Sequence, residues 1–495
     1  MESIITQILE KFTLGFLEAQ KAFFAKPDQF ANYVILLSDK LQTLGVDLVR
    51  YTLESYNDAL CKSGKRKEKY YVEKHDNKQL VTSLGAVDFK KTLFSSKEKQ
   101  DEMLYILDKI MGFDKHQRMS DDAVANVLKE AVQTSYRKGG ENVNPTGDIS
   151  KMAVKDLIHK LKFPVGYKVP VQKKIVDYLY IDADEDHAHL QFQEKKGDLE
   201  KDENGRKKNG IITKLIYVYE GVEPESPRSR RNKLIGTFYF SRVTNNNKAL
   251  WDEVYSYIDA TYDLSKVKKI YLNADGGEWI KGGMRYIHGI EYVLDEFHLS
   301  KYLMKMTRHM LDSQDDAADQ LRSAIRSKTK EEFHEKVAEL CGYAETEKIK
   351  NRIIEASDYI LKNWTAAKTR LNRRGAICGC SAEGHVSHVL SSRMSTPPLG
   401  WSRKGAAQMA RLREYYYNGG DFLELAEYQH KNKNEVRLSE KEKEEIILSA
   451  NSIMVASRAG RSIYEMELGK YYDAMAATIY TQTKKQLSFY LCGKI

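Results

Sequence analysis

The stretch from residue 175 to residue 294 constrains the fold of this chain most, because the spacing of its apolar residues changes along it. It contains three segments with strand-like patterns, then one with helical spacing, then two more strand-like segments. Their limits are 175–192, 213–219, 234–242, 249–262, 268–273 and 290–294. Three strands joined by charged loops, a crossover helix and two further strands predict an α/β sheet.

This order of elements is typical of a sheet of the ribonuclease-H type. After it, residues 299 to about 372 show helical spacing without a strand signal and are interpreted as continuous helix. Helical patterns return from residue 414 to residue 495. The α/β core is therefore followed by an all-helical segment and a helical C-terminal region.

The N-terminal 160 residues are predicted to be mainly helical. Two helices separated by Pro27 precede a short hairpin, whose strands cover 70–74 and 80–94 with turn residues at 76 and 77. Two more helices, about 120–136 and 150–162, begin at serine N-caps. With Lys151 and Lys155 exposed, this pair fits a DNA-reading helix-turn-helix. Simple helical packing is the alternative, because the connection is long for such a turn.

Two aspartates lie on one face of the first strand of the sheet. In the run from Tyr178 to Asp184, Leu179, Ile181 and Ala183 share one face, whereas Asp182 and Asp184 share the other. Buried carboxylates are costly unless they are paired or bound to a metal. The alternative is a strand end that runs into solvent.

Two further acids stand where a ligand could approach. Asp275 follows the apolar strand 270–273 and precedes Gly276 and Gly277, although a turn aspartate without a catalytic role would look the same. Glu383 begins a predicted helix, 381–393, that Ser381 caps. Asp184, Asp275 and Glu383 offer hard oxygen ligands, which suit Mg²⁺ or Mn²⁺ rather than zinc. Two such ions can activate a nucleophile and stabilise the leaving oxygen in an attack on a phosphodiester.

The net charge of +9 is concentrated in one segment. Between Asp358 and Glu414 there are ten basic residues and a single acid, Glu383, while the rest of the 495 residues carries equal numbers of each. A basic stretch that contains Trp401 is expected to follow a phosphate backbone, and a solvated helical face is the alternative. The predicted contacts to DNA are Arg373, Arg374, Arg393, Arg403, Lys404 and Trp401.

Other classes of protein lack support in the sequence. No apolar run is long enough to span a membrane, and five scattered cysteines indicate a reducing compartment, so a cytoplasmic, nucleoid-associated protein is expected. P-loop, Rossmann and nucleophile-elbow motifs are absent. Cys378, Cys380, His385 and His388 could bind zinc, but their spacing is poor for a tetrahedral site, and packed side chains are the favoured alternative.

Several blocks of sequence resemble one family. They are 182–184, 272–280, 294–299, 381–388 and 398–402, together with the 82–89 hairpin. These blocks are similar to the Lre-type bacterial insertion-sequence transposases, relatives of the Mutator-like transposases that carry an acidic DDE triad. The resemblance covers most of the chain, and the block around Glu383 is its most specific part.

The resemblance implies a ribonuclease-H-like core interrupted by helices, and metal-dependent cleavage and strand transfer on double-stranded DNA at transposon ends and target. Asp275 and Glu383 match the second and third family acids. Asp184 matches the first better than Asp182, and this choice stays open. Asp295 and His298 match an Asp-x-x-His motif that supports the site, a capping aspartate and a packed histidine being the alternative.

The expected organisation follows from these patterns and from the resemblance. The predicted parts are N-terminal helices and hairpin (1–112), helix-turn-helix-like region (113–168), first part of the core (169–298), helical insertion (299–372), second part of the core with the basic stretch (373–413) and helical C-terminal region (414–495). Assembly on paired ends implies a homo-oligomer. The alternative functions are a non-catalytic repressor derived from a transposase and a simple metal-dependent nuclease.

Overall fold

A computed structural model describes residues 4–98, 102–145, 149–167, 169–191, 210–229, 231–327, 329–373, 379–396, 399–430 and 438–455. The fold is mixed α/β, and the chain divides into two compact units. The first unit comprises 1–131, 135–154 and 422–495, and the second comprises 132–134 and 155–421.

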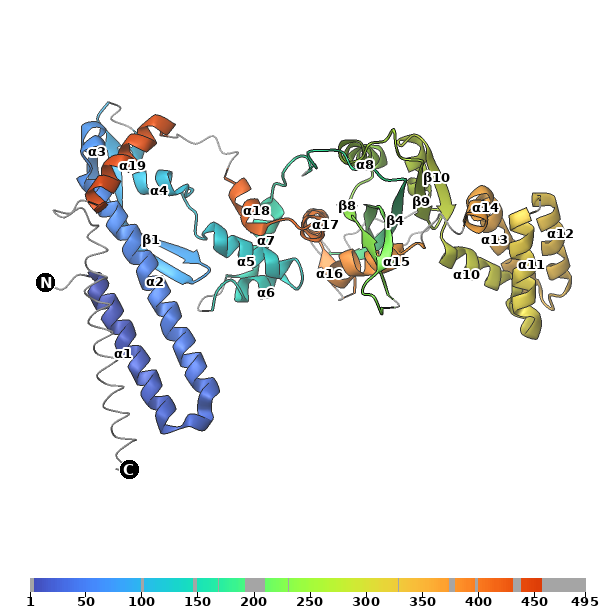
Figure 1. The fold of residues 1–495 in the computed structure, drawn as a ribbon, viewed down its shortest axis with the longest axis horizontal. Coiled ribbons are helices and arrows are strands. Elements are labelled where there is room, and N and C mark those ends of the chain that lie inside the picture. The colour runs from blue at the N-terminus through green and yellow to red at the C-terminus, as the bar shows by residue number, and fades with distance from the viewer. Residues whose placement is uncertain are drawn as a thin grey trace. The chain divides into compact units, whose positions relative to one another are not determined.

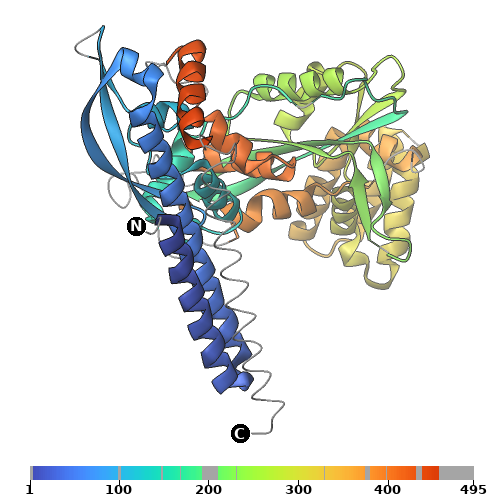
Figure 2. The ribbon, with the colours of Figure 1, turned by 60° about the vertical axis from the view of Figure 1, so that its left-hand side comes forward.

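The first unit combines long helices with a small antiparallel sheet. Its elements are α1 (Ile4–Ala25), η1 (Pro27–Gln29), α2 (Phe30–Lys62), α3 (Gly64–Lys69), β1 (Tyr70–Thr82), β2 (Gly85–Ser96), β3 (Met103–Leu104), α4 (Ile106–Met111), α5 (Asp121–Ala131), α6 (Tyr136–Glu141), α18 (Phe422–Tyr428) and α19 (Glu440–Val455). Figure 2 shows α1 and α2 side by side as an antiparallel pair. Leu60, Phe89, Phe94 and Ile446 belong to a core that α2, the hairpin and α19 share.

The hairpin differs from its prediction. Asp76 and Asn77, the expected turn residues, lie inside β1 opposite Lys91 and Lys90. The chain turns at residues 83–84, where the Thr82 hydroxyl donates to the Gly85 carbonyl (2.9 Å) and Gly85 has a φ of +145°. Glycine tolerates that backbone conformation, so the turn forms there and the polar pair stays in the strand.

The expected helix-turn-helix is also altered. The first helix ends at Ala131, and α6 occupies part of the segment that the sequence indicated as a connection. The second helix, α7 (Lys151–Lys160), begins at Ser150, whose hydroxyl accepts from the Ala153 amide (3.2 Å) as predicted for an N-cap. Since α7 continues from one unit into the other, DNA reading by the pair stays a prediction.

The second unit contains a mixed sheet whose strands follow the predicted order. The predicted strand 234–242 is divided in two, however, and its first part pairs with an unpredicted strand, Gly221–Pro224, outside this sheet. Its elements before the insertion are β4 (Tyr178–Leu190), β5 (Gly210–Tyr219), β6 (Gly221–Pro224), β7 (Asn232–Ile235), β8 (Phe238–Arg242), α8 (Asn247–Thr261), β9 (Lys269–Ala274), α9 (Glu278–Lys281), η2 (Gly282–Arg285) and β10 (Ile290–Leu294). Among the described residues the strand order is β10-β9-β4-β5-β8, with β11 (Gly400–Trp401) beside the end of β4. β4, β5 and β8 are antiparallel, whereas β4, β9 and β10 are parallel.

The insertion is all-helical but is not one continuous helix. It consists of α10 (Glu296–Thr307), η3 (Arg308–Ser313), α11 (Gln314–Ser327), α12 (Lys330–Gly342), α13 (Glu347–Lys362) and α14 (Trp364–Asn372). Leu311 breaks the first helical run with a φ of 46°, and Thr329 and Thr346 cap new helices. Apolar spacing alone did not reveal these breaks, because it persists across them.

Helices cover both faces of the sheet (Figure 1). On one face, Trp251, Val254 and Ile258 of α8 pack against Ile181 and Leu272. On the other face lie α15 (Ala382–Val386), the π-helical turn η4 (Ser387–Ser391), α16 (Ser392–Met394) and α17 (Arg403–Tyr417). The predicted 381–393 helix is therefore present with a π-helical turn inside it.

Candidate active site

β4 and β9 lie side by side in parallel, and an aspartate follows the same point of each. Asp182 is paired with Asn273 at the end of the ladder, and Asp184 and Asp275 each come two residues after that pair. Burial raises the pKa of Asp184 to about 6, and the charge of Asp275 adds to the rise. Two of the three predicted acids are thus close neighbours, Asp184 in the middle of β4 and Asp275 directly after the end of β9.

The loop after Asp275 is held by the helical insertion. Gly277 donates its amide to the Asp275 carboxylate (3.0 Å), and the hydroxyl of Tyr359 from α13 donates to the Asp275 carbonyl. Gly276 has a φ of +102°, and a Cβ there would lie 3.1 Å from the side-chain amide of Asn363. The glycine is needed both for the backbone conformation and for the approach of the insertion.

Asp295 and His298 form the predicted pair. The Asp295 carboxylate caps α10 by accepting from the Phe297 amide (3.3 Å), and its other oxygen contacts His298 Nδ1 (3.0 Å). This hydrogen bond raises the pKa of His298, and the charge of Asp275 adds to the effect. The charge of His298 in turn lowers the pKa of Asp184, so the imidazole belongs to the same site.

Asp182 occupies a different position from Asp184. It is fully buried, and its two oxygens accept from the hydroxyls of Tyr217 (2.8 Å) and Tyr219 (3.1 Å), from Asn273 Nδ2 (2.8 Å) and from the Ser381 amide (3.1 Å). Burial raises its pKa, and these donors oppose that rise. The strand alternation was predicted correctly, but the two aspartates on its polar face have different surroundings.

Glu383 lies on α15, which packs over β4, and its side chain is exposed. Ser381 does not cap this helix with its side chain as predicted; its hydroxyl contacts Tyr217 (3.0 Å) instead. In the part of the chain that the structure describes, no three His, Cys, Asp or Glu side chains are grouped as ligands of one metal ion. The neighbouring carboxylates of Asp184 and Asp275 could serve as two ligands of one divalent cation. Glu383 is not among the charges that shift the pKa of Asp184.

Burial divides the predicted basic surface. Arg370, Arg393 and Arg413 are only 4%, 3% and 2% exposed. The Arg393 guanidinium lies 5.0 Å from the ring centre of Trp401, and the Trp401 indole donates to the Met394 carbonyl (2.9 Å). Arg393 and Trp401 are therefore core residues here, and their expected role as contacts to DNA stays a prediction. The segment is rich in basic residues, but three of its arginine side chains are buried in the fold and do not face the solvent.

The basic residues that are not buried include a pair from distant segments, half-buried Lys155 and exposed Lys404. Arg373, Arg403, Lys404 and Lys151 are exposed, and Arg374 lies outside the described residues. Burial is the main reason why the pKa of His159 is lowered, and the charges of Lys155 and Lys404 lower it further. The positive charges of α7 and of the start of α17 therefore both lie near His159. The structure thus brings together two of the predicted DNA contacts, which the sequence analysis assigned to separate regions.

The alternative zinc ligands have other surroundings. His385 packs against Tyr217 with the rings tilted and their centres 4.5 Å apart, and it shares a hydrogen bond with the Tyr239 hydroxyl (2.8 Å). Burial lowers its pKa to about 4, so it is neutral at neutral pH. Burial also raises the pKa of the Cys380 thiol, whereas Cys378 lies outside the described residues. His385 is a packed histidine, as the favoured alternative expected.

Sequence reasoning missed several residues of the site. Asn273, Tyr217 and Tyr219 bond to Asp182, and Arg370 donates to Asn273 Oδ1 (2.8 Å) and to the Leu294 carbonyl (2.9 Å). An asparagine inside an apolar strand was a signal that could have been used. Nothing near Arg370 in the sequence connects it with the sheet.

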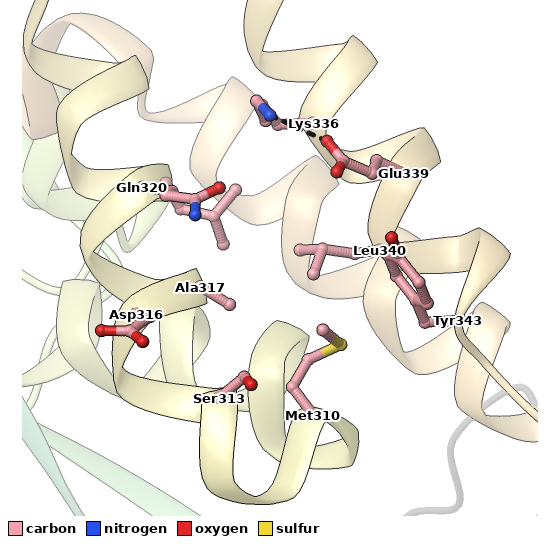
Figure 3. Close-up of a pocket in the computed structure, with 10 residues that line it drawn as sticks. Met310, Ser313, Asp316, Ala317, Gln320, Lys336, Glu339, Leu340 and Tyr343 are labelled. Carbon is pink, nitrogen blue, oxygen red and sulfur yellow. Dashed lines mark hydrogen bonds and ion pairs between the residues drawn. The ribbon is translucent and has the colours of Figure 1, made fainter.

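A separate cavity of about 270 Å³ lies in the helical insertion (Figure 3). It is lined by residues of η3, α11 and α12, including Met310, Asp316, Leu340 and Tyr343, and the ion pair of Lys336 and Glu339 (2.8 Å) lies at its edge. None of the predicted site residues contributes to its lining.

Comparison with known proteins places the chain in a family. Residues 29–432 match the model of an uncharacterised protein family, UPF0236. The chain belongs to the UPF0236 family. A UPF0236 protein of Caldanaerobacter subterraneus subsp. tengcongensis, whose name joins eleven loci, is 33% identical over 90% of this chain and 91% of its own length. Another from the same organism, with four loci in its name, is 33% identical over 88% of this chain and 87% of its own length.

More distant similarities extend the comparison. A UPF0236 protein in the vanSb 3′ region of Streptococcus gallolyticus is 22% identical over 78% of this chain and 85% of its own length. Among solved structures, the Drosophila P element transposase strand transfer complex is matched over 72% of this chain and 92% of the other chain. Its identity is 9% and its TM-score is 0.21, so this match carries no argument here. No helix among the described residues is long and apolar enough to cross a membrane.

Proposed function

We propose that this UPF0236 protein is a DDE-type DNA transposase of an insertion sequence, similar to the Lre type, with a ribonuclease-H-like core. The observation that carries the proposal is the pair of neighbouring carboxylates, Asp184 in the middle of β4 and Asp275 directly after the end of the adjacent parallel strand β9. The strand order β10-β9-β4-β5-β8, with three antiparallel strands followed by a crossover helix and two parallel strands, supports the assignment of the core.

The residues of the site support metal-dependent phosphoryl transfer. Asp184 and Asp275 would hold Mg²⁺ or Mn²⁺, and Glu383 would complete the set on a DNA-bound form. When bound, such ions polarise the phosphate and assist the attacking and leaving oxygens. His298, oriented by Asp295 and with a raised pKa, is placed to donate a hydrogen bond to a phosphate oxygen near Asp275.

The names of the relatives agree with mobility. A protein whose name joins eleven loci of one genome is encoded repeatedly, which is what transposition leaves behind. Double-stranded DNA at the transposon ends and target is the proposed partner, and the active form is a homo-oligomer on DNA. A non-catalytic repressor would have the same DNA-binding surface but would not need Asp184, Asp275 and Glu383. A simple metal-dependent nuclease would cleave the DNA without joining its ends to a target.

The test incubates the purified chain with DNA that carries the ends of its element, in the presence of Mg²⁺ or Mn²⁺. Cleavage and joining are measured on gels for the native protein, Asp275→Asn and Glu383→Gln. Asp252→Asn is the matched control, since the carboxylate of this exposed acid on α8 pairs, among the described residues, only with Lys248 at 3.9 Å. We expect each site variant to lose at least a hundredfold in rate, and the control to retain it.

Each alternative has its own outcome in this experiment. Binding without cleavage by the native protein would support the repressor, and cleavage without joining would support the nuclease. Equal cleavage by Glu383→Gln would remove Glu383 from the catalytic set.

A further inference from the structure

Three polar side chains each precede a proposed catalytic acid by two residues. Asp182 precedes Asp184, Asn273 precedes Asp275, and Ser381 precedes Glu383. These three residues are bonded to one another: Asp182 Oδ1 accepts from Asn273 Nδ2 (2.8 Å), and Asp182 Oδ2 accepts from the Ser381 amide (3.1 Å). One buried carboxylate therefore joins the three segments that carry the acids.

We propose that Asp182 is a positioning residue that holds β4, β9 and the start of α15 in mutual register, and that it is not a metal ligand. The inference rests on the proposed function, in which Asp184, Asp275 and Glu383 act together. It also assigns the first acid of the set to Asp184.

The hydrogen bonds of Asp182 leave no room for a cation. Each of its oxygens accepts two hydrogen bonds. Oδ1 accepts from Asn273 and from the Tyr219 hydroxyl (3.1 Å), and Oδ2 accepts from the Ser381 amide and from the Tyr217 hydroxyl (2.8 Å). An ionised carboxylate offers about four acceptor positions, and all of them are used here. The side chain is also fully buried, whereas a ligand must present a free lone pair to the ion.

The network continues into the elements on either side. Arg370 of α14 donates to Asn273 Oδ1 (2.8 Å) and to the last carbonyl of β10, that of Leu294 (2.9 Å). At the other end, the Tyr217 hydroxyl contacts the Ser381 hydroxyl (3.0 Å). Hydrogen bonds thus run without a break from the helical insertion, through two strands, to the helix of Glu383.

Strand geometry explains why this network would place the acids. Residues i and i+2 of a strand point to the same face, so fixing the Asp182 side chain also fixes the face of Asp184. Asp275 comes directly after the end of β9, so fixing the Asn273 side chain fixes the end of the strand from which Asp275 extends. Metal-ligating side chains depend on such supporting hydrogen bonds for their orientation.

The first test uses the metal-free protein. Asp182→Asn keeps the size of the side chain but replaces one carboxylate oxygen by an NH₂ group, which cannot accept a hydrogen bond from the groups that donate to Asp182. We expect hydrogen exchange of a peptide covering 379–386 to become roughly tenfold faster, because the Ser381 amide loses a charged acceptor. Asp186→Asn is the matched control, since Asp186 lies on the same face of β4 but accepts from Ser391 and Ser395 (both 2.7 Å). That control should leave 379–386 unchanged.

The second test separates positioning from metal ligation. In the cleavage assay, Asp182→Asn should lower kcat at least tenfold while the Mn²⁺ concentration for half-maximal rate changes less than about twofold. Asp275→Asn should raise that concentration. If Asp182→Asn does not fold, Tyr217→Phe replaces it, because this change removes one donor and retains the carboxylate.

Two results would overturn the inference. If residues 379–386 exchange at the native rate in the Asp182→Asn protein, Asp182 does not hold the start of α15. If Asp182→Asn raises the Mn²⁺ concentration for half-maximal rate as much as Asp275→Asn does, Asp182 is a metal ligand. A native protein that cleaves no DNA would instead defeat the proposed function, while the exchange experiment would still decide whether Asp182 holds these segments.

Discussion

Among single residues, burial decides which charges serve the fold and which face the solvent. Arg370 and Arg403 both belong to the basic stretch, yet Arg370 is 4% exposed and bonds to two carbonyl groups, while Arg403 is exposed at the start of α17. Their sequence neighbourhoods do not distinguish them. The roles follow from what each side chain contacts.

Arg370→Met should therefore lower the stability of the chain. The Asn273 and Leu294 carbonyl groups would lose their donor inside the fold, which is expected to lower the free energy of unfolding by about 2–4 kcal/mol. Urea unfolding measures the change. Arg403→Met serves as the control and should alter stability by less than about 0.5 kcal/mol; equal effects would contradict the structural role of Arg370.

The two crowded aspartates give a second prediction for single residues. Asp275→Asn removes a negative charge next to Asp184, so the pKa of Asp184 should fall from its value of about 6 while burial still holds it above the ordinary range. Carbon-detected NMR titration of the metal-free protein measures it. An unchanged pKa would mean that the two carboxylates are not neighbours.

Individual elements begin and end where polar contacts break the apolar pattern. The insertion divides at Thr329, where the Thr329 hydroxyl and the Glu332 carboxylate form a capping box, and again at Thr346. These signals were present in the sequence. They were outweighed there by apolar spacing that continues from one helix into the next.

His430, two residues after the end of α18, contacts the first residue of α5 and the loop before it within the first unit. Its Nδ1 contacts Asp114 and its Nε2 contacts Asp121, each at 2.8 Å, and the hydrogen bond that it donates to Asp121 is the main reason why its pKa is raised. Both ring nitrogens donate only when the imidazole is protonated. The contact is therefore strongest in the charged form.

A raised pKa in the folded state predicts the direction of a pH effect. The stabilisation is complete below the ordinary histidine pKa of 6.5 and is lost as the pH rises through the folded value. We expect the native chain to lose more stability between pH 6 and pH 8.5 than His430→Gln, measured by urea unfolding. Parallel losses in the two proteins would show that His430 contributes nothing to this pH dependence.

For the molecule as a whole, the distribution of exposed charge matters more than the net charge of +9. Lys155 and Lys404 are 249 residues apart in the chain and both act on His159. We expect the double variant Lys155→Gln/Lys404→Gln to bind DNA more weakly and to reduce the salt slope of log K by about 2. Filter binding over a range of salt concentrations measures the slope.

The control for this prediction is Lys248→Gln/Lys268→Gln. These lysines are exposed in the same unit and pair only with Asp252 (3.9 Å) and Asp177 (2.9 Å) in the described contacts. Their replacement should leave the slope unchanged. A similar loss in both proteins would indicate a diffuse effect of charge rather than a surface at Lys155 and Lys404.

The sequence by itself determined the order of the strands and of the crossover helix that form the main sheet of the second unit, and the two faces of β4. Alternation separates Ile181 and Ala183 from Asp182 and Asp184, because the faces of a strand depend only on local geometry. Only the tertiary structure decided that Asp182 joins three segments, that Arg370 and Arg393 are buried, and that Lys155 lies near Lys404. Burial and hydrogen bonding depend on residues that are far apart in the chain, and no local pattern records which of them will meet.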